Sequence, residues 1–374
     1  MAGDWVSFSR TAPVAWVSVG NWIGLASDTK KSVECCTSQV GTVVRNNFAA
    51  YYKNQKTLSK SKYRKANVRC CLSQSPKSSA PIQSDIVEVQ KCITAIACDV
   101  DGTLLDSNHY LDPSLSKLIV DTMESGIVFF PATGKSRAGA MHSFGPPLST
   151  VLGSNSMGVF LQGLLVYGQG GELIYEKTLP TETISKVVQL SSQANIPWIG
   201  YLGDRLVVEK RTQLTDSLVK YHEPRPEAVN DVCDELGLKN GVQDLAFHKM
   251  LVIDESSEII DMLRPQFETE LGGSATLTQA QADMLEILPL NASKGLGVRL
   301  LLKHLEIPEA ELLAIGDAEN DLEMLKLAGI GVAMGNALPS VKQIADEMVA
   351  SNNELGVAEA IRRFVKPKAN ISRT

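Results

Sequence analysis

The chain lacks the cysteine patterns that bind zinc or build a disulfide framework. It has seven cysteines in 374 residues, and no two of them have the C-x-x-C spacing that such sites use. Four form two adjacent pairs within the first 84 residues, and the remaining three are Cys92, Cys98 and Cys233. The sequence therefore predicts buried or free thiols in a reducing compartment.

Long hydrophobic runs are also missing. The stretch 12–26 is apolar in parts, but Ser, Gly and Asn interrupt it. It falls short of the roughly 20 apolar residues that a membrane span requires. No later stretch meets that requirement, so the sequence predicts no membrane partner.

Acidic residues are scarce at the N-terminus. Residues 1–84 carry 3 Asp/Glu against 12 Lys/Arg, together with 18 Ser/Thr. Basic, hydroxyl-rich leaders are typical of targeting peptides, so we predict a transit peptide over 1–88 and a location in the chloroplast stroma. A mitochondrial leader and a disordered basic tail are the alternatives. Residues 85–374 carry 39 acidic against 24 basic residues, which argues against a nucleic-acid partner.

Short apolar segments alternate with amphipathic ones at both ends of the remaining chain. The expected strands are 92–100, 127–133, 330–337 and 347–352, with a helix at 112–126 and a strand–turn–helix unit at 311–329. This alternation predicts an α/β fold with a doubly wound, mainly parallel sheet, built from core parts 89–180 and 290–374. Functional groups in such sheets lie at the C-terminal ends of the strands.

Residues 181–289 have a different pattern, which predicts an inserted α+β domain. The expected elements are helices at 181–194, 227–238 and 257–271 (the last disturbed by Pro265), a hairpin at 198–211, a strand at 247–254 and a strand pair at 274–290. Four basic residues of this insertion are candidates for substrate contact but are expected to be ordinary surface residues: Lys210, Arg211, His222 and Lys249.

Two aspartates, Asp99 and Asp101, follow the first buried strand. On a strand they point the same way, and like charges repel unless a cation lies between them or one is protonated. The signature Asp-x-Asp-Gly-Thr resembles the first motif of the haloacid dehalogenase (HAD) superfamily. Its chemistry suits phosphoryl transfer, because a carboxylate can attack phosphorus while a second carboxylate moves protons. An Asp-rich turn is the structural alternative.

A second acidic segment, "GDAENDLEML", ends another strand and starts a helix. Mg²⁺ prefers oxygen ligands and commonly takes one or two protein carboxylates. Asp317 and Asp321 could therefore hold Mg²⁺ against Asp99 and the backbone carbonyl of Asp101. Such an ion would offset the repulsion between the carboxylates and attract a phosphate. Helix capping by Asn320 or Asp321 is the alternative.

The segment "PATGKS" places Thr133 at a strand end and Gly134 before a helix. A hydroxyl and backbone amides at a helix N-terminus can bind an anion. A P-loop is excluded, because that motif needs a glycine where Phe129 stands. Further on, "ASKG" supplies Lys294, which could stabilise a carboxylate and a phosphoryl group together.

Taken together, the motifs resemble the Cof-type branch of HAD phosphatases, which have a C2B cap, over roughly residues 92–365. The resemblance implies that Asp99 is the nucleophile and Asp101 the acid/base. It also implies that Thr133 and Gly134 bind the phosphoryl group and that Lys294 stabilises charge.

By the same resemblance, Mg²⁺ is the cofactor and its ligands are Asp99, Asp101, Asp317 and Asp321. Asn320, in the same acidic segment, is expected to contact the substrate.

Two positions depart from the usual pattern of the family. Lys135 stands where an arginine usually follows Thr-Gly, and Gln162 stands in place of the usual asparagine before Gly163. A lysine is a point charge and cannot form the forked, bidentate contact of an arginine with a phosphate. The role of Gln162 is open.

The sequence therefore predicts a Mg²⁺-dependent phosphomonoester hydrolase that acts on a small soluble phosphate ester. A sugar phosphate, flavin mononucleotide or pyridoxal phosphate would suit the family. A phosphomutase, which also uses an aspartyl-phosphate, is one alternative. The other is a catalytically silent binding or assembly subunit of the plastid. The sequence does not indicate the oligomeric state.

Overall fold

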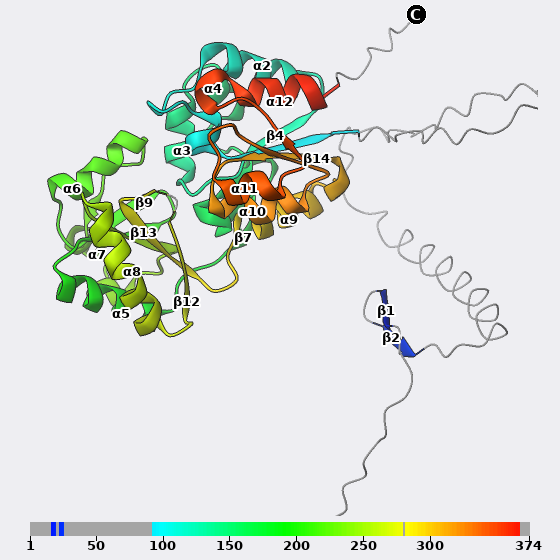
Figure 1. Ribbon diagram of the computed structural model, residues 1–374. Coiled ribbons are helices and arrows are strands. Elements are labelled where there is room, and N and C mark those ends of the chain that lie inside the picture. The colour runs from blue at the N-terminus through cyan, green and yellow to red at the C-terminus, as the bar shows by residue number, and fades with distance from the viewer. Residues whose placement is uncertain (1–15, 20–21, 26–91, 280, 367–374) are drawn as a thin grey trace, which may run out of the picture. The chain divides into compact units, whose positions relative to one another are not determined.

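The computed structural model describes residues 16–19, 22–25, 92–279 and 281–366 (Figure 1). The chain forms two compact units, Met1–Asp85 and Ile86–Thr374. In the first, strands β1 (Trp16–Val19) and β2 (Trp22–Leu25) pair as an antiparallel hairpin. The rest of the predicted leader lies outside the described residues. No helix in the described part of the chain combines the length and apolarity that a membrane crossing needs.

A sheet of five parallel strands forms the core of the second unit. The strands, in sheet order, are β16 (Glu347–Met348), β15 (Ile330–Ala333), β14 (Leu312–Gly316), β3 (Ala95–Cys98) and β4 (Val128–Pro131). Strand β3 lies between β14 and β4, and all four of its residues are fully buried. Both faces of this strand are covered, which explains its unbroken apolar sequence.

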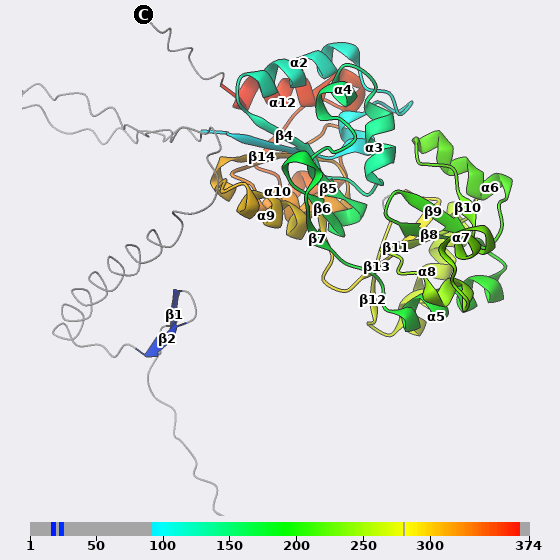
Figure 2. The same cartoon turned by 180° about the vertical axis from the view of Figure 1, so that it is seen from behind.

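Helices cover both faces of the core sheet. Figures 1 and 2 show α2 (Pro113–Glu124) and α12 (Gly356–Phe364) on one face, and α9 (Lys294–His304) and α10 (Leu322–Leu327) on the other. Helix α2 begins as predicted, because the Asp112 side chain accepts hydrogen bonds from the amides of Ser114 and Leu115. The core is therefore doubly wound.

A small antiparallel sheet was not predicted. It consists of β5 (Gly158–Phe160), β6 (Leu165–Tyr167) and β7 (Leu173–Glu176), and a parallel bridge between Val159 and Ala132 joins it to the core. Their apolar residues are interrupted by Gly163, Gly168, Gly170 and Gly171, so the segment did not read as a series of strands.

The inserted domain has a six-stranded sheet of its own. Its strands, in sheet order, are β10 (Glu227–Ala228), β9 (Arg205–Val208), β8 (Trp198–Leu202), β11 (Lys249–Ile253), β13 (Met284–Pro289) and β12 (Ala275–Thr278). Helices α5 (Thr181–Ala194), α7 (Val229–Leu236) and α8 (Ser257–Leu271) accompany it, and α8 continues through Pro265. The predicted α/β core with an inserted α+β domain is confirmed.

Alternation along these strands gives the inserted sheet two different faces. Trp198, Met250 and Ile287 belong to a hydrophobic cluster of the inserted domain, whereas Ile199 and Leu251 belong to the cluster that includes the parallel core. Since successive side chains on a strand point to opposite sides, one face of this sheet is directed at the parallel core. We refer to the inserted domain as the cap.

Candidate functional site

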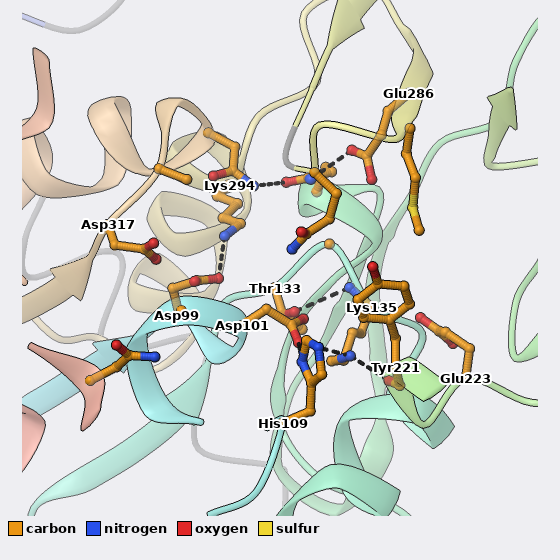
Figure 3. A pocket seen from close by; sticks show the side chains of 18 of the residues that line it. Asp99, Asp101, His109, Thr133, Lys135, Tyr221, Glu223, Glu286, Lys294 and Asp317 are labelled. Carbon is orange, nitrogen blue, oxygen red and sulfur yellow. Dashed lines mark hydrogen bonds and ion pairs between the residues drawn. The ribbon is translucent and has the colours of Figure 1, made fainter. Parts of the chain in front are cut away.

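The ends of three neighbouring core strands carry the first group of site residues. Asp99 follows β3, Thr133 follows β4 and Asp317 follows β14. Parallel strands end at the same edge of a sheet, so these residues line one pocket although they lie far apart in the sequence (Figure 3).

Lys294 connects two of the predicted carboxylates. Its ammonium group donates hydrogen bonds to Asp99 and to Oδ1 of Asp321, the latter at 2.9 Å, and its side chain is 1% exposed. Burial lowers the pKa of Lys294, but the charges of Asp321 and Asp99 outweigh it, so the pKa lies above its usual value. Burial also raises the pKa of Asp99 well above its usual range, although Lys294 opposes this effect. The lysine therefore remains charged inside the core.

Asp321 organises the loop that follows β14. Its Oδ2 atom accepts hydrogen bonds from the amides of Asp317 (2.9 Å) and Ala318 (3.0 Å), while its Oδ1 accepts from Lys294. The side chain is completely buried. These contacts hold the Asp317 backbone in place at the end of the strand.

A tight turn after β3 brings a second contact to Asp317. Gly102 has φ +79°, and a Cβ there would lie 2.5 Å from Oδ2 of Asp317, so the close approach requires glycine. Thr103 in the same turn donates a hydrogen bond of 2.8 Å to Asp317. As a result, carboxylate oxygens of Asp99, Asp317 and Asp321 lie within 4.8 Å of one another. Burial, followed by the charge of Asp321, raises the pKa of Asp317 to about 6.

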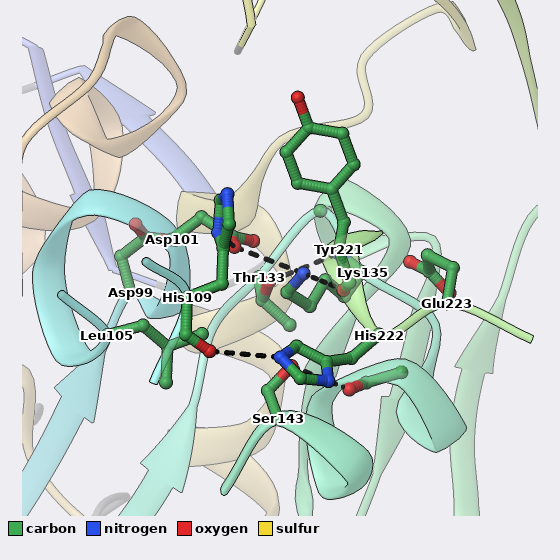
Figure 4. A network of polar contacts seen from close by, with 12 residues as sticks. Asp99, Asp101, Leu105, His109, Thr133, Lys135, Ser143, Tyr221, His222 and Glu223 are labelled. Atoms are coloured by element: carbon green, nitrogen blue, oxygen red, sulfur yellow. Dashed lines mark hydrogen bonds and ion pairs between the residues drawn. The ribbon is translucent and has the colours of Figure 1, made fainter. Parts of the chain in front are cut away.

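The Asp101 side chain makes different contacts from the other carboxylates (Figure 4). Its Oδ1 lies 3.0 Å from Nζ of Lys135 and 3.3 Å from Nδ1 of His109. Burial raises the pKa of Asp101, but these two neighbours outweigh it and hold the pKa below its usual value. Lys135 also donates to the backbone carbonyl of Tyr221 in the cap. The lysine that departs from the family pattern thus binds the predicted acid/base residue and the cap.

The sequence predicted that amides at the helix N-terminus after Thr133 bind an anion, but two of these amides donate to side chains of the cap. Helix α3 (Arg137–Phe144) does begin there, but the amide of Ser136 donates to the cap residue Glu223 at 3.0 Å. The amide of Ala138 likewise donates to Asp204 at 2.9 Å. These amides are therefore paired with cap carboxylates. The Thr133 hydroxyl accepts a hydrogen bond from the amide of Lys135. Thr133 lines the pocket.

Gly134, Gln162 and Asn320 also line the pocket. Asn320 donates a hydrogen bond of 3.0 Å to Oε1 of Gln162. Gln162 is 1% exposed and does not point to solvent. A Cβ on Gly134 would lie 2.6 Å from Nε2 of Gln162, so the glycine leaves room for this side chain.

The pocket has a volume of about 490 Å³, and the core and the cap both contribute to its wall. The cap side chains that line it include Tyr201, Tyr221, Glu223, Lys249 and Glu286. Sequence reasoning identified none of them as site residues.

The expectation that Lys249 is a surface residue is wrong. Its side chain is 2% exposed and donates hydrogen bonds of 2.8 Å to the Gly134 carbonyl and to Glu286. Lys210 and Arg211 are exposed as expected, whereas His222 is half-buried and bonds the carbonyl of His109 at 3.0 Å. Lys249 occupies the core-facing side of β11, and the alternation of that strand was the only signal of this position.

Comparisons with known proteins identify the family of the chain. The pattern of the haloacid dehalogenase-like hydrolases matches residues 96–361. A protein of Arabidopsis thaliana named "Endoribonuclease YBEY, chloroplastic" is 38% identical over 274 residues, which are 72% of this chain and 46% of that protein. This chain thus spans less than half the length of that relative.

Two further similar proteins are bacterial. A "Putative phosphatase" of Haemophilus influenzae is 29% identical over 271 residues, covering 71% of this chain and 95% of the relative. The crystal structure of a haloacid dehalogenase-like hydrolase from Bacteroides thetaiotaomicron has 26% sequence identity and a TM-score of 0.63, covering 72% of this chain and 99% of that one. The expected resemblance to HAD-type phosphatases is confirmed, and the chain belongs to the haloacid dehalogenase-like hydrolase family, in its Cof-type branch.

Proposed function

We propose that the chain is a Mg²⁺-dependent phosphomonoester hydrolase that acts through an aspartyl-phosphate on Asp99. The observation that carries this proposal is the position of Asp99 at the end of a buried strand, within 4.8 Å of two other carboxylates and hydrogen-bonded to Lys294. A buried carboxylate with an adjacent ammonium group can act as a nucleophile on phosphorus while the ammonium offsets the added negative charge.

The reaction divides into two displacements. In the first, an oxygen of Asp99 attacks phosphorus, the bond to the leaving oxygen breaks, and protonated Asp101 gives its proton to that oxygen. In the second, Asp101 takes a proton from water, the resulting hydroxide attacks phosphorus, and the bond to Asp99 breaks. Lys135 and His109 hold the pKa of Asp101 below its usual value, which favours the ionised form that the second step needs and opposes the protonated form that the first step needs.

The residues present fit a hard divalent cation. Oxygens of the Asp99, Asp317 and Asp321 carboxylates lie close together, and the ammonium group of Lys294 pairs with Asp99 and Asp321. Burial raises the pKa of both Asp99 and Asp317. Excess negative charge and oxygen ligands are what Mg²⁺ requires. We propose that Asp99 and Asp317 hold the ion, together with the predicted Asp101 carbonyl. Asp321, whose oxygens already accept three hydrogen bonds, would complete or support this set. Bound there, the ion would reduce the repulsion between the carboxylates and the phosphate.

The pocket favours a small substrate. The pocket has a volume of about 490 Å³, and residues of the core and of the cap both line it. A phosphorylated metabolite of the sugar phosphate, flavin mononucleotide or pyridoxal phosphate type is therefore the proposed substrate class. A chloroplast location is proposed from the basic, acid-poor first 84 residues and is supported by the relative named as chloroplastic.

Hydrolysis of p-nitrophenyl phosphate, with and without added Mg²⁺, tests this function. We expect release of phosphate that depends on Mg²⁺ and is abolished by chelation with EDTA. Equal release in EDTA, or no release from any phosphorylated metabolite in a broad screen, would overturn the proposal. Import of a fluorescent fusion into isolated chloroplasts tests the location.

A further inference from the structure

A chain of hydrogen bonds runs from the cap to the loop that carries Asp317. Lys249 on β11 donates to Oε1 of Glu286 on β13 at 2.8 Å, and Gln162 donates to Oε2 of the same carboxylate at 2.7 Å. Asn320 then donates to Gln162 at 3.0 Å. Lys249, Glu286 and Gln162 are 2%, 6% and 1% exposed. Figure 3 shows Glu286 across the pocket from Asp101.

The chemical groups in this series of hydrogen bonds determine which atom donates in each bond. A carboxylate paired with a lysine can only accept hydrogen bonds, so the nitrogen of the Gln162 amide must face Glu286. The oxygen of Gln162 must then face Asn320, and the Asn320 nitrogen must donate to it. Both amide orientations therefore follow from the negative charge of Glu286.

The remaining atom of the Asn320 amide is an acceptor without a partner. Among the described residues, its Oδ1 is one of the few buried side-chain atoms that make no hydrogen bond. Buried polar atoms are normally paired, and an orphaned one calls for a ligand or a water. Almost none of this oxygen is exposed, so the hydrogen bond to Gln162 is the side-chain contact that holds the Asn320 amide.

The backbone at Gln162 is shaped for this contact. Its φ is +61°, which is unusual for a residue other than glycine. The conformational strain at this residue is offset by the surrounding contacts. A Cβ on the neighbouring Gly163 would collide with the carbonyl oxygen of Ser293, next to Lys294. The turn is thus packed tightly between the predicted phosphate-binding strand end and α9.

We propose that Gln162 is a positioning residue through which the cap residue Glu286 holds Asn320, and with it the loop that carries Asp317 and Asp321. Asn320 lies between these two carboxylates in the sequence, so a shift of Asn320 would displace the side chains proposed to hold the ion. The inference rests on the proposed Mg²⁺ site. According to this inference, Gln162 couples the position of the cap to the binding of the cation.

Mg²⁺ titration calorimetry on the full chain, with a double-mutant cycle, tests the connection. Gln162→Asn shortens the side chain by one methylene and tolerates a positive φ, while Glu286→Gln keeps the shape and removes the charge. We expect each variant to weaken Mg²⁺ binding by about 3- to 10-fold, the range of a single hydrogen bond. The double variant should bind within twofold of the weaker single variant, since both act through one chain.

Glu223→Gln is the matched control, because Glu223 is an equally buried cap carboxylate that bonds the core at Ser136, outside this chain. Combined with Gln162→Asn, its effect should multiply. The inference is overturned if the effects of Gln162→Asn and Glu286→Gln also multiply, or if neither variant changes the affinity by more than twofold. If one of these variants does not fold, the Mg²⁺ affinity of the other alone tests the inference, which is overturned when that affinity changes by less than twofold. The readout is Mg²⁺ affinity, so a failure to hydrolyse p-nitrophenyl phosphate would be seen separately.

Discussion

Lys294 donates to Asp99 after strand β3 and, at 2.9 Å, to Asp321 in the loop after strand β14. One buried ammonium group therefore links two neighbouring strand ends whose carboxylates would otherwise repel each other. This link explains how the core maintains several acidic side chains around the candidate nucleophile.

Replacing Lys294 by methionine should destabilise the fold and abolish hydrolysis. Removal of one partner from a buried ion pair typically costs about 3 to 5 kcal/mol, because the remaining charges are left uncompensated. Urea unfolding in EDTA measures this loss. Lys303→Met on the same helix is the control, and because Lys303 is exposed its effect should stay within about 0.5 kcal/mol. Equal stability of the two variants would contradict the link.

Asp317→Asn should increase the concentration of Mg²⁺ needed for half-maximal activity by at least about tenfold. The change removes one negative charge from the cluster while retaining an oxygen that can accept from Thr103. The dependence of activity on Mg²⁺ concentration measures this effect. Asp121→Asn, at an exposed ion pair on α2, serves as the control. An unchanged requirement for Mg²⁺ in Asp317→Asn would remove Asp317 from the proposed site.

The cap contact of Glu223 predicts a dependence of stability on pH. Burial raises the pKa of Glu223 in the folded chain above the usual 4.5, so the folded state binds its proton more tightly than the unfolded state does. The ionised glutamate thus costs stability above this raised pKa. Glu223→Gln should be more stable than the wild type at pH 7. Thermal unfolding should show this advantage shrinking as the pH falls toward 4.5, and a larger advantage at low pH would contradict the assignment.

Hydrolysis, rather than isomerisation, should account for the products. Lys135 and His109 hold the pKa of Asp101 below its usual value, so this residue is prepared to take a proton from water in the second step. With a panel of sugar phosphates, release of inorganic phosphate should equal loss of substrate. An isomerised sugar phosphate as the main product would favour a phosphomutase instead.

The sequence predicted the residues at the strand ends well because their signals are local. Asp99, Thr133 and Asp317 each directly follow an apolar run, and the parallel arrangement of those runs brings them to one edge. The fold class and the inserted α+β domain follow from the same patterns of apolar residues. Their roles in catalysis remain predictions.

The cap wall could not be predicted in the same way. Lys249 and Glu286 stand on short strands, where a polar residue normally indicates a face in contact with water. Here that face meets the core: Lys249 and Glu286 pair with each other, Glu286 accepts from Gln162, and Lys249 donates to the Gly134 carbonyl. The alternation of β11 shows which residues share a face, but it does not show that this face meets the core, and Glu223 lies outside any strand and was missed.

Acid-quenched trapping of the phosphoenzyme tests the central claim most directly. The wild-type chain, mixed with p-nitrophenyl phosphate and Mg²⁺ and then digested, should carry phosphate on the peptide that contains Asp99. Asp99→Asn should carry none and should release no phosphate. Phosphate on another residue, or equal hydrolysis by the two proteins, would contradict the account.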